Sequence, residues 1–509
     1  MAKEVIDLWV LFQPETLLYL FGATFLGIIV GVIPGLTATM AVSILLSFTY
    51  GLKGSNAIVV LVAIYLSVIY GGSRTAILLN IPGTPSSAAT VLDGFPLAKK
   101  GEGGIAGIVV TTFSSLGGIF GLIVLAIATP IVARFALKFA YWEYFWLTMM
   151  GVLISASITT GDSPTYKGII SGFLGMLIAC VGMDPIHGYS RMSFGSMNLM
   201  AGINLVPAMI GLFGMTEVYY AIKDPETHHV LEPKNRVSVI SLMGNSFTFL
   251  LKHFKVYFQS SLIGTFIGIL PGVGPDIASW VSYGTAKRSS KHTEEFGKGS
   301  WEGIIASETA NSAATSGAFV PVLTLGIPGD AVTAVILGGI QMHGYRPGPT
   351  FFFENPNFVY FVVGVLFLVN IVMWFQGCYL SSIIAKVLKV RMEYIMPLIV
   401  VFCVVGSYTI NLRKFDVIVM LIFGLIGIVM RKLKIPPAPM ALGIILGSMG
   451  DLNFRRGMLA GGFSLHNFFV RPLSIILIVV ICFSLFYPVI RKAVEKRLKT
   501  EVKAVDSKK

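Results

Sequence analysis

The chain has 509 residues, of which 55% are hydrophobic and only 12% are charged. Because soluble proteins carry roughly 25% charged residues, this composition excludes an ordinary soluble domain. The net charge is +13, and the basic residues fall in short loops and in residues 491–509, where eight Lys and Arg exceed three Asp and Glu by five. This distribution follows the positive-inside pattern of membrane proteins and does not indicate nucleic-acid binding.

Apolar runs recur along the whole chain and predict an all-α polytopic membrane protein with about 10–12 transmembrane helices. In the first half we expect apolar segments over residues 16–33 and 40–48, which form either one interrupted span or a helix hairpin, and spans over 56–70, 105–133, 144–157, 168–182 and 199–222. In the second half we expect apolar segments over residues 259–270, 301–325 and 331–341, with Pro-Gly pairs between them, and spans over 358–376, 395–409, 415–430, 437–449 and 473–489. No run shows the short alternating pattern of a transmembrane barrel.

The polar segments between these runs suggest how the chain is divided. We expect a first repeat over residues 1–222, a polar linker over 223–255, a second repeat over 256–490 and a basic cytoplasmic tail over 491–509. The adjacent His228 and His229 in the linker are better explained by exposure than by a metal site. Residues 93–101 are predicted to form a turn and a basic loop, and residues 451–456 a loop that is outside the membrane or re-entrant.

Each half contains two Pro-Gly pairs that interrupt apolar segments, in the same order. Residues 31–35 match residues 268–272, and residues 80–83 match residues 326–329. Backbone that leaves a helix at membrane depth must be buried in protein or line a water-filled cavity. Matched interrupted segments in two halves are the best sequence indication of a midplane binding site in secondary transporters. The alternative interpretation is a set of Pro-kinked packing helices.

The breaks predict the kind of ligand. A half-helix N-terminus presents free N–H groups and a positive dipole end, which suits a carboxylate. The residues that we expect to contact such a solute are Gly35, Thr37, Arg74, Asn80, Pro82, Gly83, Thr84, Ser86, Ser87, Gly272, Gly274, Asn311, Pro328 and Gly329. Unwound carbonyls and acidic side chains near the breaks suit a coupling ion, Na⁺ or H⁺. The candidates are Asn80, Asp276, Glu308, Asn311, Gly326 and Asp330.

Arg74 has two interpretations. It is either a clamp on an anionic solute, since a guanidinium binds carboxylates in a two-pronged geometry, or a structural residue. The structural alternative is an internal ion pair with Asp330, Glu308 or Asp276, or a side chain that extends to the membrane surface. Glu308 and Asn311 lie three residues apart and therefore share one helical face. For Asp276 and Asp330, helix caps or exposed loop acids are the alternative.

No enzyme signature is present. The chain lacks GxSxG, HExxH and GxxxxGK[ST], and the last absence excludes a P-loop ATP motor within this sequence. An intramembrane enzyme would need a nucleophile and a base at depth, whereas the histidines lie mostly in loops, so we expect no enzyme and no cofactor. GxxxG pairs predict close helix packing at Gly27/Gly31, Gly117/Gly121 and Gly264/Gly268.

Residues 31–39, 70–104, 268–276, 307–314 and 325–339 resemble the large membrane subunit of tripartite tricarboxylate transporters, the TctA type. The resemblance covers nearly the whole chain. It implies a bacterial inner-membrane secondary transporter for carboxylates that works with a small membrane subunit and a periplasmic solute-binding protein, coupled to Na⁺ or H⁺. The family's motif positions correspond to Pro34, Gly35, Asn80 to Pro85, Asp93, Pro271, Gly272, Glu308, Asn311, Pro328 and Gly329.

Three positions depart from the pattern expected for the family: Arg74, where we expect a small or apolar residue, Asp330, where we expect a small one, and the Asn311-Ser312 pair in place of paired Asn. The first two suggest either a mutual ion pair or a solute that differs from citrate. The prediction is therefore a permease subunit that imports a di- or tricarboxylate, with its C-terminus in the cytoplasm. The alternative is an uncoupled carboxylate channel or exporter.

Overall fold

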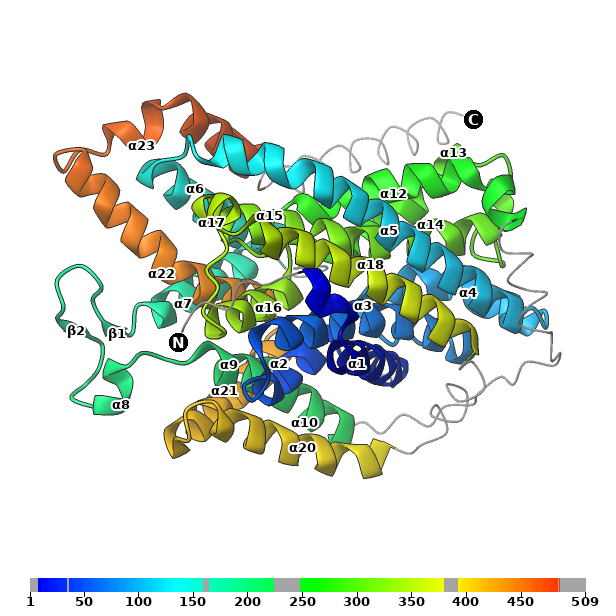
Figure 1. The fold of residues 1–509 in the computed structure, drawn as a ribbon, viewed down its shortest axis with the longest axis horizontal. Coiled ribbons are helices and arrows are strands. Elements are labelled where there is room, and N and C mark those ends of the chain that lie inside the picture. Colours follow the sequence, from blue (N-terminus) through cyan, green and yellow to red (C-terminus); the bar gives the residue numbers. More distant parts are fainter. Residues whose placement is uncertain are drawn as a thin grey trace, which may run out of the picture. The chain divides into compact units, whose positions relative to one another are not determined.

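The computed structural model describes residues 8–33, 36–158, 164–223, 248–379, 392–483 and 485. Within these residues the chain is almost entirely helical, which confirms the predicted all-α class (Figure 1). The chain packs into two compact units. Unit 1 comprises Met1–Leu137 and Asn204–Val429, and unit 2 comprises Lys138–Ile203 and Met430–Lys509. The predicted division into two sequence repeats, a linker and a tail is a different division and stays a prediction. The tail and most of the linker lie outside the described residues.

Unit 1 holds most of the helices. Its first segment contains η1 (Leu8–Phe12), α1 (Pro14–Val32), α2 (Ala38–Thr49), α3 (Gly54–Leu79), η2 (Pro85–Ser87), α4 (Ala88–Lys99) and α5 (Gly103–Ala136). Its second segment contains α9 (Leu205–Met209), η3 (Ile210–Met215), α10 (Thr216–Lys223), α12 (Phe254–Ile269), α13 (Gly274–Ser289), η4 (Thr293–Glu295), α14 (Trp301–Gly317), α15 (Phe319–Leu325), α16 (Ala331–Met342), α17 (Pro349–Glu354), α18 (Pro356–Tyr379), α20 (Met392–Thr409) and most of α21 (Lys414–Lys432).

Four helices of the described part are long and apolar enough to cross a membrane unaided: α1, α3, α5 and α18. Shorter apolar helices accompany them, among them α2, α7 and α16. α3 is the most enclosed of the four: 89% of the residues in its 18-residue apolar stretch are buried inside the protein, compared with 39% for α5. α3 is therefore the central helix of unit 1 in this multi-pass membrane protein.

Equivalent helix ends occur in the two halves of unit 1. α1 ends at Ile33 with φ −83° and ψ 113°, and α12 ends at Leu270 with φ −76° and ψ 118°. α3 ends at Asn80 with φ 64° and ψ 24°, and α15 ends at Gly326 with φ 68° and ψ 28°. Both pairs are the positions that the repeated Pro-Gly motifs match, so the duplicated sequence gives duplicated helix ends.

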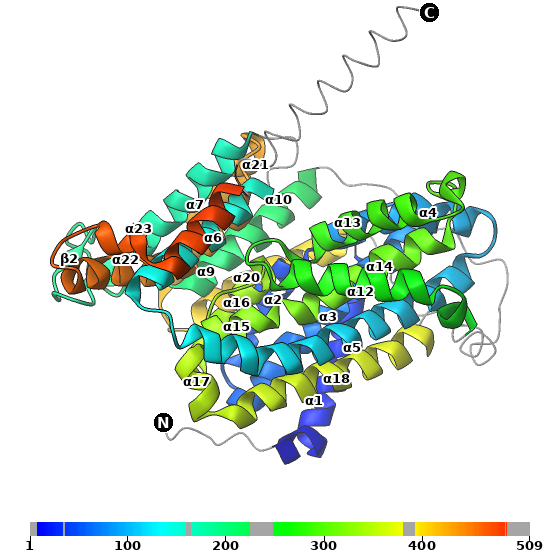
Figure 2. The same ribbon diagram turned by 90° about the horizontal axis from the view of Figure 1, so that it is seen from above.

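The halves of unit 1 interlock through glycine-lined contacts. α5 lies along α14, and α18 lies along both α5 and α3 (Figures 1 and 2). A methyl group added at Gly117 would lie 3.0 Å from the Thr309 Cα, and one at Gly268 would lie 2.8 Å from the Ala314 Cα, with the carbonyl oxygens of both residues closer still. The three predicted GxxxG pairs all lie at such close helix contacts, which confirms the expected role of these glycines.

Several expected loops are wrong. α3 continues through residues 70–79, so the first-half interruption is confined to Asn80–Thr84. Asp93–Pro96 lies inside α4, and Asp451–Arg456 lies inside α22 (Pro437–Ala460). The predicted apolar segment over residues 301–325 is divided at Ala318 into α14 and α15. Polar residues were taken as loop signals, but these ones find partners on neighbouring elements and so are tolerated within helices.

Unit 2 consists of α6 (Tyr141–Ile158), α7 (Thr165–Ala179), strands β1 (Gly182–Met183) and β2 (Ser190–Arg191), α8 (Met197–Met200), α22 and α23 (His466–Val470). The antiparallel strands pair Gly182 with Arg191 and Met183 with Ser190. They lie in the polar segment that the sequence places between spans. α7 packs closely on α22 through Gly175, where an added methyl would lie 2.9 Å from the Met440 carbonyl carbon.

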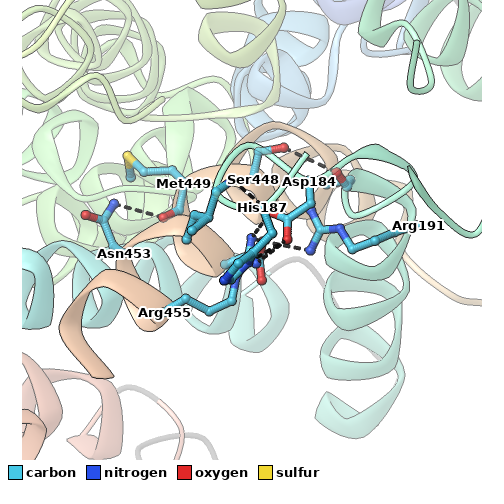
Figure 3. Close-up of polar contacts among 10 residues, drawn as sticks. Asp184, His187, Arg191, Ser448, Met449, Asn453 and Arg455 are labelled. Carbon is cyan, nitrogen blue, oxygen red and sulfur yellow. Dashed lines mark hydrogen bonds and ion pairs between the residues drawn. The ribbon is translucent and has the colours of Figure 1, made fainter. Parts of the chain in front are cut away.

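A salt-bridge network ties the hairpin of unit 2 to α22 (Figure 3). Arg455 donates to both carboxylate oxygens of Asp184 at 2.8 Å, and Asp451 accepts from Arg455 at 2.7 Å and from Arg191 at 3.0 Å. The hydrogen bonds from Arg455 hold the pKa of the Asp184 carboxyl well below its usual range. This network explains why the acidic and basic residues of α22 do not form a loop.

Candidate functional site

In the first half, the end of α1 and the break after α3 meet. Thr75 on α3 donates its hydroxyl to the Val32 carbonyl at 2.9 Å, which satisfies one of the last carbonyls of α1. The Gly83 N–H donates to the Gly72 carbonyl at 3.2 Å, and a methyl added at Gly83 would lie 2.7 Å from the Gly72 Cα. Pro34 and Gly35 lie outside the described residues.

The two breaks of the second half also meet, through a direct backbone bond. The Gly272 N–H donates to the Gly329 carbonyl at 2.7 Å. Gly272 and Gly274 have φ values of 84° and 72°, which favour glycine, and a methyl at Gly274 would lie 2.9 Å from the Asp330 Cβ. Pro328 and Gly329 are buried. In the second half, the two Pro-Gly pairs are therefore neighbours in space.

The helices that follow the breaks are capped in matching ways. Thr84 donates its N–H to the Ser87 hydroxyl at 3.4 Å, which donates to the Thr84 carbonyl at 2.8 Å. Asp330 donates its N–H to the Thr333 hydroxyl at 2.9 Å, which lies 3.1 Å from the Asp330 carbonyl. Asp330 follows Thr84 by 246 residues, and Thr333 follows Ser87 by the same number, which is also the separation of Gly326 from Asn80. Ser86 contacts the Thr84 hydroxyl at 2.9 Å, and Thr37 caps α2 by accepting from the Met40 N–H at 3.2 Å.

The breaks of the two halves come together. α13, which begins at the Gly272 break, packs against η2 and α4, which follow the Asn80 break. From α3, the buried Tyr65 hydroxyl donates to Asp330 Oδ2 at 2.5 Å. The side chains differ in access: Thr84, Ser86 and Ser87 are buried, whereas Asn80, Pro82 and Asp276 are exposed. The hydroxyls therefore hold the break together, and the side chains of Asn80, Pro82 and Asp276 lie on its accessible side.

Two carboxylates lie near this junction. Asp276, in the first turn of α13, interacts electrostatically with Asp330 at the N-terminus of α16. Asp330 also accepts from the Thr333 N–H at 2.7 Å, so the positive end of α16 already has its own carboxylate. The corresponding cap before α4 is the neutral Thr84. The N-termini of the helices that follow the two breaks therefore differ in charge. Asp330 places a carboxylate at the N-terminus of α16, whereas Thr84 places none at the first-half break.

A third carboxylate, Glu308 on α14, lies in a cluster of hydroxyls. Glu308 Oε2 accepts from Ser73 at 2.5 Å and from Ser114 at 3.1 Å, and Oε1 accepts from Thr90. Thr90 also contacts the Ser307 hydroxyl at 2.9 Å. All five side chains, which we call the Glu308 cluster, are completely buried. They come from α3, α4, α5 and α14, and so join helices of both halves.

Asn311 is also fully buried, as expected of a residue on the Glu308 face. Its Oδ1 accepts from the Ser312 hydroxyl at 3.0 Å, and its Nδ2 has no hydrogen-bond partner. Among the residues that the structure describes, no group of three or more His, Cys, Asp and Glu side chains could hold a metal ion. The oxygen-rich Glu308 cluster, with a single carboxylate, is thus the best oxygen-lined candidate for an ion.

Asp93 is a further fixed point. One oxygen accepts the backbone N–H groups of Gly297, Gly299 and Ser300 at 2.7, 2.9 and 2.9 Å, and the other accepts from the Tyr283 hydroxyl at 2.9 Å. The side chain is completely buried. Asp93 thus binds α4 to α13 and to the loop that leads into α14, the helix that carries Glu308.

Arg74 does not form the ion pair that was one of its two interpretations. Its guanidinium donates to the Tyr70 hydroxyl at 2.7 Å, the Thr111 hydroxyl at 2.8 Å and the Gly377 carbonyl at 2.5 Å. Arg74 is 5% exposed, so it does not extend to the surface either. Within the described chain it therefore links α3, α5 and α18 through neutral acceptors, and the interpretation as a pair with Asp330, Glu308 or Asp276 is wrong.

Sequence reasoning missed several residues of the site. Ser73 and Thr90 lie in the polar stretch around the first-half break, where a search for hydroxyls on neighbouring helices would have found them. Tyr65 and Ser114 lie in apolar runs and give no local signal. Gly326 contributes the left-handed end of α15, as Asn80 does for α3, and makes no contact with the Glu308 cluster among the hydrogen bonds of the described residues.

Residues 17–442 match the model of the tripartite tricarboxylate transporter TctA family. An uncharacterized 52.8 kDa protein from the TAR-I ttuC' 3' region of Agrobacterium vitis is 34% identical over 467 residues, which is 92% of this chain and 92% of that protein. An uncharacterized protein from the TAR-II ttuC' 3' region of Agrobacterium vitis is 34% identical over 211 residues, 42% of this chain and 87% of that protein. No solved structure matches the chain. The chain belongs to the TctA family, a family of transporter subunits and not of enzymes.

Proposed function

We propose that this chain is the permease subunit of a binding-protein-dependent secondary transporter that imports a di- or tricarboxylate across the bacterial inner membrane. The observation that carries the proposal is the meeting of broken helices from both halves, where α13 packs against η2. Such breaks are tolerated at membrane depth only where they are buried or line a water-filled cavity. The small membrane subunit and the periplasmic solute-binding protein that the family name implies would be its partners.

The solute is proposed to bind on the accessible side of the first-half break. Asn80 and Pro82 are exposed there, and the nearby helix cap, Thr84, is neutral. A carboxylate group is attracted to the positive N-terminal end of the helix that follows. The cap of α16 is a poorer place for an anion because Asp330 supplies a negative charge of its own.

The adjacent carboxylates favour gradient coupling over an uncoupled channel or exporter. Asp276 is exposed and close to Asp330, on the helix that contacts η2. An anionic solute that arrives beside these acids is repelled unless a cation or a proton arrives with it. We therefore propose cotransport with Na⁺ or H⁺, with Glu308 and Asp276 as the acids that respond to the ion, and with the C-terminus on the cytoplasmic side.

The test is uptake of radiolabelled di- and tricarboxylates by vesicles that contain the chain, its small membrane subunit and its binding protein. Accumulation above the external concentration is expected for at least one carboxylate, and it should collapse when the Na⁺ and H⁺ gradients are removed. Asn80→Gly should raise the half-saturating concentration without loss of folding, because Gly326 adopts the same left-handed conformation. Flux that persists without any gradient would support the channel alternative.

A further inference from the structure

Glu308 is an acid at the centre of the protein without a basic partner. It is completely buried, and no Lys, Arg or His forms an ion pair with it among the residues described. A buried ionised carboxylate is tolerated only when it is hydrogen-bonded, paired with a cation or bound to a metal. The surroundings of Glu308 therefore indicate which positive charge it accepts.

The hydroxyls around Glu308 donate to a carboxylate, whereas other hydroxyls of these helices donate to backbone carbonyls. Ser67 donates to the Ala63 carbonyl at 2.6 Å and Thr111 to the Gly107 carbonyl at 2.7 Å, each one helical turn back. Such local bonds are the usual choice of a hydroxyl within a helix. Ser73 and Ser114 donate across helices to Glu308 instead. Carboxylate and hydroxyl oxygens thus converge from four helices on one fully buried point.

We propose that the Glu308 cluster binds a monovalent cation, Na⁺. Carboxylate and hydroxyl oxygens are hard ligands, and a single carboxylate balances a single positive charge. A proton needs only one acceptor, whereas Ser73, Thr90 and Ser114 surround both carboxylate oxygens. When the ion enters, the hydroxyl protons turn to the carbonyls one turn back, as in Ser67, and the hydroxyl oxygens face the ion.

The Glu308 cluster connects the two sides of the first-half break, so an ion bound there would hold both sides in place. Ser73 precedes the interruption at Asn80–Thr84, and Thr90 follows it. Glu308 holds both, so an ion at this point fixes the two sides of the segment that we propose to contact the solute. This step rests on the proposed function, because it makes Na⁺ the ion whose binding organises the carboxylate site.

The experiment measures ion binding without any solute. The purified chain is unfolded by heat in NaCl and in choline chloride at equal ionic strength and pH, and across a series of Na⁺ concentrations. Na⁺ is expected to raise the unfolding midpoint in a saturable way, because an ion that binds only the folded state stabilises it. Glu308→Gln should abolish the shift, and Ser114→Ala should raise the half-effective Na⁺ concentration by about tenfold or more.

Ser115→Ala is the matched control, since Ser115 is the next residue of α5 and donates to the Asn370 carbonyl at 3.0 Å instead. It should keep the wild-type response to Na⁺. Equal midpoints of the wild-type chain in NaCl and choline chloride would overturn the proposal whether or not the variants fold. A shift that follows pH and not Na⁺ would assign the cluster to a proton and overturn it too. Carboxylate uptake is scored separately, so a failure of transport leaves this result intact.

Discussion

The Asp93 contacts give the clearest quantitative prediction. Three backbone N–H groups and the Tyr283 hydroxyl all donate to this one buried carboxylate. Asp93→Ala leaves four donors without an acceptor, and three of them, the N–H groups of Gly299 and Ser300 and the Tyr283 hydroxyl, are buried. Each unpaired buried group costs about 1–3 kcal/mol, so we expect a loss of at least about 3 kcal/mol, taking the low end for each buried donor. Asp93→Asn keeps an oxygen for the backbone donors, so its loss should be smaller, about 1–3 kcal/mol.

The assay is thermal or denaturant unfolding of the detergent-solubilised chain, with the folded yield from membranes as a second readout. Glu102→Ala is the control, because Glu102 lies just beyond α4 and its side chain forms no cap hydrogen bond. The expected order of stability is wild type and Glu102→Ala, then Asp93→Asn, then Asp93→Ala. An Asp93→Ala chain as stable as the Glu102→Ala chain would refute the reasoning that this carboxylate fastens α4 to the start of α14.

Three further predictions follow from contacts of the same kind. Gly31→Ala should destabilise the chain by about 1–3 kcal/mol, since the added methyl would lie 2.9 Å from the Val68 Cα, whereas Gly22→Ala, with nothing within 4 Å, should be tolerated in the same unfolding assay. Arg74→Lys should lower stability by losing part of a three-acceptor fork while the half-saturating solute concentration stays unchanged; a rise in that concentration would restore the clamp interpretation. Because Arg455 lowers the folded-state pKa of Asp184 below its unfolded value near 3.8, the stability that Asp184 contributes is present above that value and is lost as pH falls from there toward the folded pKa. Asp184→Asn should flatten this acid-side decline in unfolding midpoints measured from about pH 5 down to about pH 2.

The sequence was sufficient to predict the fold class and the breaks, and the reason is physical. Apolar runs in a membrane protein must be helices, and a Pro-Gly pair inside such a run must interrupt the helix. The matched helix ends at Asn80 and Gly326 are the structural result of the repeat. The GxxxG glycines were interpretable for the same reason, because a missing side chain at regular spacing has one main use in a bilayer.

The polar contacts could not be predicted from the sequence. Asp93 was assigned to a turn because an acid next to glycine and proline usually marks one, but its partners lie about 200 residues away, at Gly297–Ser300. For Arg74 the sequence left a solute clamp and an internal acid pair open, because it could not show the neutral acceptors, which come from three separate helices. Glu308 was selected correctly as a buried acid, yet its hydroxyl partners depend on how α3, α4 and α5 pack together.

The most direct test of the central claim is a density map of the chain with a transported carboxylate bound. The account predicts density for the solute at the junction of η2 and α13, on the side where Asn80 and Pro82 are exposed. Solute density elsewhere in the protein, with both breaks facing lipid, would contradict the claim that the duplicated breaks form the binding site.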